Sequence, residues 1–295
     1  MRLEDEKTLR QLIINADDLG ADQARNEGIF EALEAGVVTA ASILVNGNAF
    51  QNAVQRIVST PIDHVSFGVH LNLTEGRPLS TGLKRIADAD GLFHGKAAGQ
   101  KLMMTRNDKT LEEDIIKETA AQILRLKQAG VRIDHLDGHH HIHVFPAVTD
   151  IAVKTAVTFG IPWIRIPDEP YPAEILHPKD PILELEAQHF SLLAAAARPT
   201  IKESSMQMTD YFRGLYLKGR LSLNNLDTML QTLPPGLTEF MVHPGRMPIK
   251  AASGPFSSFS NRDRQEELTV LKDPGFRVML NRYHIQITHF PEAAP

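Results

Sequence analysis

Residues 135–146 read HLDGHHHIHVFP, and this stretch holds five of the 13 histidines in the 295-residue chain. Imidazole is the commonest side-chain ligand of transition-type metals, and a neighbouring Asp can bind the metal or fix the tautomer of an imidazole. So many histidines within a few residues are hard to explain by packing in a core. The stretch therefore predicts a metal or catalytic site, and the alternative is a solvated, histidine-rich loop.

Strands and helices alternate on both sides of this stretch. It follows a predicted strand at 131–136 and leads into a predicted helix at 148–159. The apolar patterns predict further strands at 12–14, 37–45, 65–71, 163–166, 206–214, 237–242 and 283–287, and helices at 22–35, 49–58, 110–129, 182–197, 221–233 and 262–280. This alternation predicts an α/β fold with a parallel sheet, and seven or eight units favour a single irregular, TIM-like β/α barrel over an open sheet.

The whole chain, 1–295, is expected to form one domain, because no repeat, low-complexity run or linker divides it. One connection, at about 74–108, is long and rich in glycine. Loops of this length in a compact domain are usually functional or mobile, so we expect this one to cover the mouth of the barrel. Residues from about 289 to 295 are expected to form a C-terminal tail.

Composition narrows the range of partners. A formal net charge of -5 gives no electrostatic case for binding nucleic acid or an anionic membrane. The absence of cysteine excludes disulfides, thiolate metal ligands and a Cys nucleophile. Residues 1–7 are too acidic for a signal peptide, and no apolar run approaches transmembrane length. We therefore expect a cytoplasmic protein that acts on a small molecule.

Polar residues gather where the predicted strands end, and the C-terminal rim of a parallel barrel is where catalytic groups collect. Outside the histidine stretch they are Asp17, Asp18, His70, Arg165 and His243. Each also has a purely structural interpretation. The Asp pair could cap a helix, His70 could be a core histidine, Arg165 could be an ion-pair partner and His243 could be a turn residue. Taken together, carboxylates and imidazoles without thiols suit a divalent ion such as Zn²⁺, Mg²⁺, Mn²⁺ or Co²⁺ and predict metal-assisted hydrolysis.

Six short motifs together resemble one known family. They are NADDLG at 15–20, LVNG at 44–47, GVHL at 68–71, EGRP at 75–78, HLDGHHHIH at 135–143 and HPG at 243–245. In this combination the chain resembles the YdjC-like carbohydrate deacetylases, which include the chitooligosaccharide deacetylases, from the first strand to about Arg277. It departs from the commoner pattern at Leu19, which stands where Phe is usual.

The resemblance implies an irregular β/α barrel, one divalent metal ion and removal of an acetyl group from an N-acetylated sugar. It implies that Asp18, His70 and His139 are the metal ligands and that Asp17 is the base that activates the metal-bound water. In the broader NodB-type deacetylases an Arg near a Pro steadies the base, and Arg165 is the residue that could do so here.

Further residues are expected to serve the substrate and the leaving group. His243 could protonate the leaving group. Asn72, Glu75 and Arg77, near the start of the long connection, could bind sugar hydroxyls, or Glu75 and Arg77 could only stabilise a turn. His141 is expected to face the substrate. The expected partner is a small carbohydrate, and a homodimer is one possible assembly.

Three other functions stay open at this point. Another metal-dependent barrel hydrolase, an amidohydrolase or phosphoesterase, would often carry His-x-His on the first strand, where this chain has Asp17 and Asp18. A glycosidase could use Asp17 and Asp137 as paired acids without a metal. A sugar- or metal-binding homologue could keep the barrel and have lost catalysis.

Overall fold

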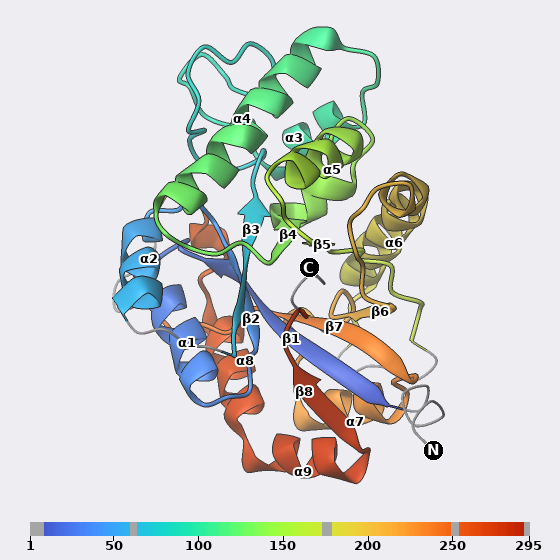
Figure 1. The fold of residues 1–295 in the computed structure, drawn as a ribbon. Helices are drawn as coiled ribbons and strands as arrows, with labels where there is room; N and C mark the ends of the chain where they lie inside the picture. The colour runs from blue at the N-terminus through green and yellow to red at the C-terminus, as the bar shows by residue number, and fades with distance from the viewer. Residues whose placement is uncertain (1–8, 60–63, 173–178, 249–253, 292–295) are drawn as a thin grey trace.

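The computed structural model describes residues 9–59, 64–172, 179–248 and 254–291 (Figure 1). Its eight strands form one sheet in the order β5-β4-β3-β2-β1-β7-β6, with β8 paired to β1. The strands are β1 Arg10–Leu19, β2 Ala40–Ile43, β3 Ser66–Leu71, β4 His135–Gly138, β5 Trp163–Ile164, β6 Tyr211–Arg213, β7 Gly236–Val242 and β8 Ile285–Thr288. All the pairings between these strands are parallel. The expected irregular, TIM-like β/α architecture is confirmed.

The sheet curls into a half-barrel rather than a regular closed one. Its end strands are β5 and β6, and a single bridge between Trp163 and Gln207 links the two sides. The long strand β1 crosses the centre of the molecule (Figure 1). Its first half, Arg10–Ile13, pairs with β8, and β2 takes over from Asn15 onward. Because all the strands are parallel, their C-terminal ends lie at the same end of the half-barrel.

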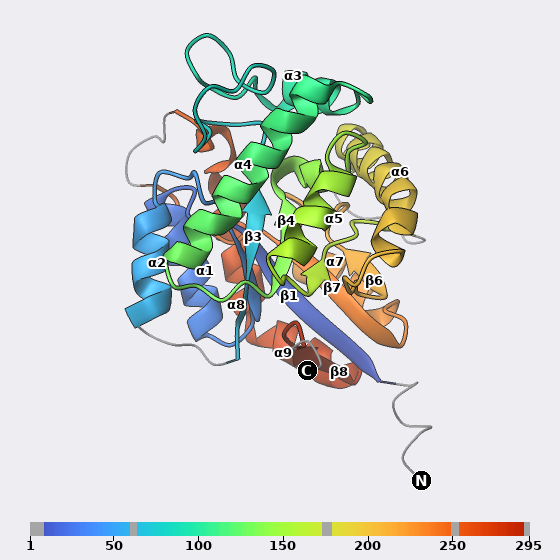
Figure 2. The same cartoon turned by 45° about the horizontal axis from the view of Figure 1, so that its top comes forward.

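Helices surround this curled sheet, most of them on its outer face, whereas α3 lies beyond the C-terminal ends of the strands (Figures 1 and 2). They are α1 Gln23–Glu34, α2 Phe50–Ser59, α3 Lys96–Met103, α4 Lys109–Gln128, α5 Thr149–Thr158, α6 Pro181–Lys202, α7 Leu223–Gln231, α8 Arg262–Lys272 and α9 Pro274–Arg282. One large cluster of buried apolar side chains fills the space between helices and sheet. Along β3, apolar Phe67 and Val69 belong to this cluster, whereas His70 points to the inside of the barrel, as the alternating pattern predicts.

The prediction of one helix over 262–280 is wrong. Asp273 ends α8 and caps α9 by accepting a hydrogen bond from the N–H of Gly275, and Pro274 stands at the first turn of α9. Proline has no backbone N–H to donate inside a helix, but it fits the first turn, where that N–H needs no partner. The Asp-Pro pair therefore starts a second helix.

The connection at 74–108 is not entirely a loop, because it contains α3. It is also fixed to α4. The Asp114 carboxylate accepts hydrogen bonds from the backbone N–H groups of Lys84 and Arg85 at 2.7 and 2.6 Å. One turn along, Glu118 accepts two more from residues 79 and 80. Buried carboxylates on one face of a helix thus hold the connection in a defined path.

The expected C-terminal tail begins later than residue 289. Phe290 is 2% exposed and stacks on His135 with 4.3 Å between ring centroids. The indole N–H of Trp163 donates to the carbonyl of Pro291 at 2.9 Å. Phe290 therefore packs inside the barrel next to Ile13 and Ala40, whereas Pro291 is exposed. Residues 292–295 of the predicted tail, and the acidic residues 1–7, lie outside the described residues.

Within the ranges that the structure describes, every helix is too short or too polar to cross a lipid bilayer.

Candidate active site

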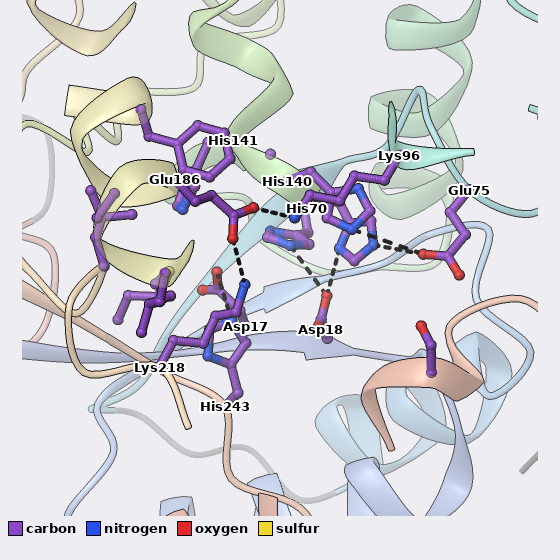
Figure 3. Close-up of a pocket in the computed structure, with 18 residues that line it drawn as sticks. Asp17, Asp18, His70, Glu75, Lys96, His140, His141, Glu186, Lys218 and His243 are labelled. Carbon is purple, nitrogen blue, oxygen red and sulfur yellow. Dashed lines mark hydrogen bonds and ion pairs between the residues drawn. The ribbon is translucent and has the colours of Figure 1, made fainter. Parts of the chain in front are cut away.

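Asp17 and Asp18 reach the same cavity because β1 bulges between them. The pairing of β1 with β2 shifts register between Ala16 and Leu19, and Asp18 has a φ of 70°. In an unbroken strand two successive side chains would point to opposite faces. The left-handed conformation of Asp18 itself breaks this alternation. Both carboxylates line a cavity of about 180 Å³ at the C-terminal end of the sheet (Figure 3).

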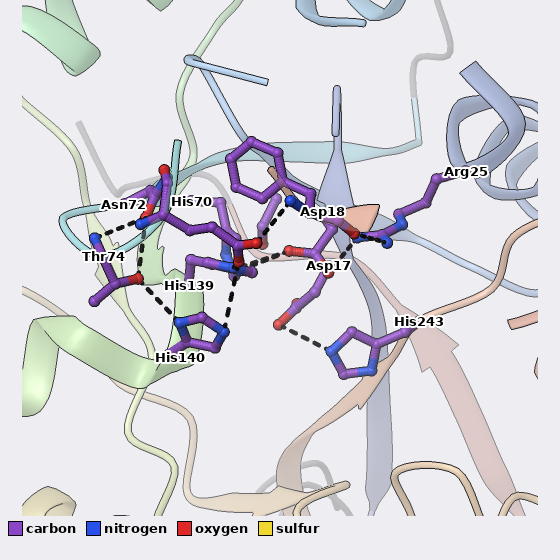
Figure 4. A network of polar contacts seen from close by, with 12 residues as sticks. Asp17, Asp18, Arg25, His70, Asn72, Thr74, His139, His140 and His243 are labelled. Atoms are coloured by element: carbon purple, nitrogen blue, oxygen red, sulfur yellow. Dashed lines mark hydrogen bonds and ion pairs between the residues drawn. The ribbon is translucent and has the colours of Figure 1, made fainter. Parts of the chain in front are cut away.

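Asp18, His70 and His139 converge on one point in this cavity (Figure 4). The Asp18 Oδ1 atom lies 2.9 Å from His139 Nδ1 and 3.3 Å from His70 Nε2. All three residues are buried. Although it is buried, Asp18 Oδ1 makes no hydrogen bond of good geometry with any described residue. These three potential ligand atoms, one carboxylate oxygen and two imidazole nitrogens, surround a common point, as the ligands of a cation do.

Each histidine of this trio has a carboxylate on its other ring nitrogen. His70 Nδ1 lies 2.8 Å from Asp137 Oδ1, and His139 Nε2 lies 3.2 Å from Glu75 Oε2. Metal-binding histidines commonly donate their second N–H to such a partner, which fixes the tautomer and the ring orientation. The inner nitrogens are therefore oriented for a ligand. The trio of Asp18, His70 and His139 could hold one divalent ion.

The electrostatic environment keeps Asp18 charged. Burial alone would raise its pKa, but His139 and Arg25 outweigh burial and hold the pKa well below its usual value. Arg25 Nη1 lies 2.8 Å from Asp18 Oδ2, so it engages the oxygen that faces away from the histidines. Burial also disfavours a charged His70, yet the carboxylates of Asp137 and Asp17 raise its pKa to about 10. A metal must therefore displace a proton from His70.

Asp17 belongs to a second group, centred on Arg165, in which all side chains are between 0% and 3% exposed. The Arg165 guanidinium donates to both oxygens of Asp17 at 2.7 Å, as a bidentate pair. It also lies 2.8 Å from Asp137 and 2.7 Å from Glu239. Burial raises the pKa of Asp17 in spite of Arg165. A carboxylate held in position with a raised pKa is suited to accept a proton.

His243 faces Asp17 from the end of β7. Its Nε2 atom lies 3.9 Å from Asp17 Oδ2 (Figure 4). The backbone N–H of His243 donates to Glu267 at 2.6 Å. Burial and the nearby Arg264 lower the pKa of His243 well below its usual value. The resting imidazole is therefore neutral, and a proton could pass from Asp17 to His243 once their 3.9 Å separation shortens or a water bridges it.

Two other groups of side chains could in principle hold a metal, and both are poorer choices. Asp17, His70 and Asp137 form one of them. Arg165 already binds both of those carboxylates, so a metal there would face a guanidinium at short range. Glu75, His139 and His140 form the other, which competes with the first set for His139 and in which Glu75 and His140 are only partly buried.

The residues predicted to bind sugar do not all reach the cavity. Glu75 and His141 line it, whereas Asn72 and Arg77 do not. Asn72 is 0% exposed and donates to the carbonyl of Glu75 at 2.7 Å. Arg77 donates to the carbonyl of Gly91 at 3.2 Å on the surface of the long connection. His141 has a φ of 53°, a left-handed conformation that turns the histidine stretch sharply after β4.

Several residues at the site were not found from the sequence. They are Arg25, Glu239 and Phe256, together with Lys96, Glu186 and Lys218 on the cavity wall. Phe256 packs its ring edge-on to His139, at 5.6 Å between centroids, and donates its backbone N–H to Glu75 at 2.7 Å. Arg25 and Glu239 lie near the motifs that end β1 and β7 but belong to no motif themselves, and the other four residues come from separate segments, so only the fold shows that all six meet at the site.

The sequence comparisons agree on the family of proteins to which the chain is similar. A sequence model of the family described as YdjC-like protein matches residues 11–282. A mouse protein named carbohydrate deacetylase is 31% identical, over 94% of this chain and 93% of its own length. A human protein of the same name is 30% identical, over 94% of this chain and 89% of its own length.

A solved structure supports the fold. The protein comes from Enterococcus faecalis V583 and is named after cellobiose-phosphate cleavage. It superposes on this chain with a TM-score of 0.72 at 22% identity, covering 96% of this chain and 98% of its own. At this identity the likeness concerns the fold alone.

Proposed function

The chain belongs to the YdjC-like protein family, and we propose that it is a metal-dependent carbohydrate deacetylase that hydrolyses the acetamido C–N bond of N-acetylated sugars. The observation that carries the proposal is the division of labour between two adjacent carboxylates. Asp18 turns its free oxygen toward His70 and His139, while Asp17 is held by Arg165 beside His243. A ligand set and a proton acceptor thus share one cavity. The carbohydrate deacetylase names of the relatives support the same activity.

Asp18, His70 and His139 would hold the divalent ion. When bound, such an ion polarises an acyl oxygen and makes water acidic enough to be deprotonated near neutral pH. Carboxylate and imidazole ligands suit Zn²⁺, Mg²⁺, Mn²⁺ or Co²⁺.

The other residues of the site handle the proton. Asp17 takes a proton from the water that attacks the acetyl carbon, and Arg165 holds both Asp17 oxygens so that the carboxylate cannot rotate away. The neutral His243 receives that proton and delivers it to the nitrogen as the C–N bond breaks. Acetate and a free amino sugar are the products.

The glycosidase alternative is poorly supported. It would need Asp137 as the second acid beside Asp17, but Asp137 is 0% exposed and does not line the cavity. Its oxygens are engaged by Ser42 at 2.6 Å, by His70 and by Arg165. A carboxylate enclosed in this way cannot protonate a glycosidic oxygen.

A screen for acetate release tests the proposal. Acetylated mono- and oligosaccharides are incubated with the protein as purified, with EDTA, and with EDTA followed by excess Zn²⁺, Mg²⁺, Mn²⁺ or Co²⁺. We expect acetate release that EDTA abolishes and at least one ion restores. Full metal loading without acetate release from any sugar would contradict the deacetylase activity, and chelator-resistant release would contradict the metal requirement.

A further inference from the structure

Three charged side chains line the same cavity as the metal-ligand trio (Figure 3). They are Lys96 at the start of α3, Glu186 in α6 and Lys218 in the segment after β6. Glu186 Oε1 is bonded to Lys96, and its other oxygen lies 3.6 Å from Lys218. All three residues line the same cavity as Asp17 and His243. We call them the mouth trio.

The ion pairs within the mouth trio are expected to contribute little to the stability of the fold. Its side chains are 40%, 24% and 28% exposed for Lys96, Glu186 and Lys218, and ion pairs with that much solvent contact contribute little to stability. Lys218 nevertheless lines the cavity together with Asp17 and His243, so its ammonium group lies near the reaction centre. The three residues are thus placed to meet a ligand in the cavity.

The chemistry of the mouth trio fits a sugar ring. A carboxylate between two ammonium groups presents an acceptor flanked by donors, and a vicinal pair of hydroxyls can both donate and accept. Beside the trio, Leu183, Ala187 and Phe190 form an apolar wall suited to the C–H face of a ring. Asn72 and Arg77, the residues otherwise expected to bind hydroxyls, lie outside the cavity.

We propose that Lys96, Glu186 and Lys218 bind the ring hydroxyls of the sugar unit that carries the acetamido group and so position that group for Asp17. This rests on the proposed deacetylase function. The mouth trio neither binds the metal nor transfers the proton. Its loss should therefore weaken substrate binding and leave metal content unchanged.

The test compares Glu186→Gln and Lys218→Met with Glu184→Gln, a matched control on the same helix. Glu184 is also 24% exposed but bonds to Tyr171 and Arg220 outside the cavity. Binding of N-acetylglucosamine is measured by NMR titration, beside acetate release, metal content and thermal unfolding. We expect the two mouth variants to bind the sugar about tenfold to a hundredfold more weakly, since each loses a hydrogen bond to a charged group. KM should rise by a similar factor, with kcat changed less, and Glu184→Gln should behave as the parent.

Deoxy analogues of N-acetylglucosamine sharpen the test. If a side chain of the mouth trio hydrogen-bonds a sugar hydroxyl, removing that hydroxyl weakens binding to the parent protein. It does not weaken binding to the variant in which that side chain is replaced. Parent-like sugar binding in both mouth variants would overturn the proposal, as would loss of metal or unfolding in both, because either would show a structural role. Lys96→Met is the second route to the same answer should Glu186→Gln fail to fold. Failure of the deacetylase function is distinct, because acetate release would then be absent from the parent protein as well.

Discussion

The Arg165 group and the mouth trio are both sets of ion pairs at one cavity, but they differ in how they are built. Asp17, Asp137 and Glu239 lie on strands, Arg165 directly follows β5, and all four side chains are almost fully buried. The mouth trio comes from two helices and a connecting segment and is partly exposed. Strand register fixes atoms to within hydrogen-bonding distance, so it suits bond-breaking chemistry. Helices and connections can vary without disturbing the sheet, so they suit recognition of the substrate.

The two sets also differ in their charge balance. One guanidinium serves three buried carboxylates in the Arg165 group, so the protonation of each carboxylate depends on the others. In the mouth trio, two ammonium groups share one carboxylate, and solvent screens them. Substitutions should therefore have large effects on chemistry and stability in the first set and small effects on stability in the second.

The largest expected effect is on turnover. Asp17→Asn removes the proton acceptor while an amide of similar shape stays beside Arg165, so kcat for acetate release should fall by about two to four orders of magnitude. Steady-state kinetics on metal-loaded protein measures this. Turnover at the parent rate with full metal content would show that Asp17 is not the base.

The next effect is on stability. Arg165→Met leaves three buried carboxylates without their cation, so the free energy of unfolding should fall by about 3–5 kcal/mol. Urea denaturation of the metal-free protein gives the value. Arg246→Met is the control, because Arg246 pairs with Glu31 at a site where its side chain is 46% exposed. If both variants lost the same small amount of unfolding free energy, the Arg165 group would not contribute to stability as described.

A smaller effect concerns pH. Burial raises the pKa of Glu239 to about 7 in spite of Arg165. The folded protein therefore keeps a proton on Glu239 that the unfolded chain loses above its ordinary pKa of 4.5, so this group lowers stability as pH rises from about 4.5 to 7. Glu239→Gln should remove the part of the decline in stability with rising pH that Glu239 causes. Unfolding free energies at pH 5 and pH 8 for parent and variant measure it, and identical pH dependence would argue against a protonated Glu239.

The smallest effect is expected in the mouth trio. Lys96→Met should change the free energy of unfolding by no more than about 1 kcal/mol, because the Lys96 side chain is 40% exposed. Urea denaturation run beside Arg165→Met compares the two sets directly. A loss of several kcal/mol would show that the mouth trio ties α3 to α6 as a structural element.

Much of the fold could be predicted from the sequence because local patterns report it. Apolar alternation and Gly or Pro boundaries indicate the strands and most helices, and a parallel sheet follows from their alternation. The bulge at Asp18 and the docking of Phe290 could not be predicted, because both depend on neighbouring strands. The break at Asp273-Pro274 was visible in the sequence, since Pro after a capping Asp commonly starts a helix.

The candidate site also has residues that the sequence predicts and residues that it does not. Asp17, Asp18, His70 and His243 stand at strand ends, and the fold of a parallel barrel brings strand ends together whatever the details. Glu239 lies within a strand and shows its role only through its contact with Arg165. The mouth trio carries no motif, because its members are ordinary surface residue types on separate segments.

The central claim is that adjacent carboxylates at the end of β1 have different tasks. It is tested most directly by metal content, measured after loading with one divalent ion and exhaustive dialysis, for Asp18→Asn beside Asp17→Asn. Asp17→Asn should retain one equivalent. Asp18→Asn should lose most of it, because a neutral amide is a weaker ligand than a carboxylate. Equal retention in both variants, or loss confined to Asp17→Asn, would contradict this assignment.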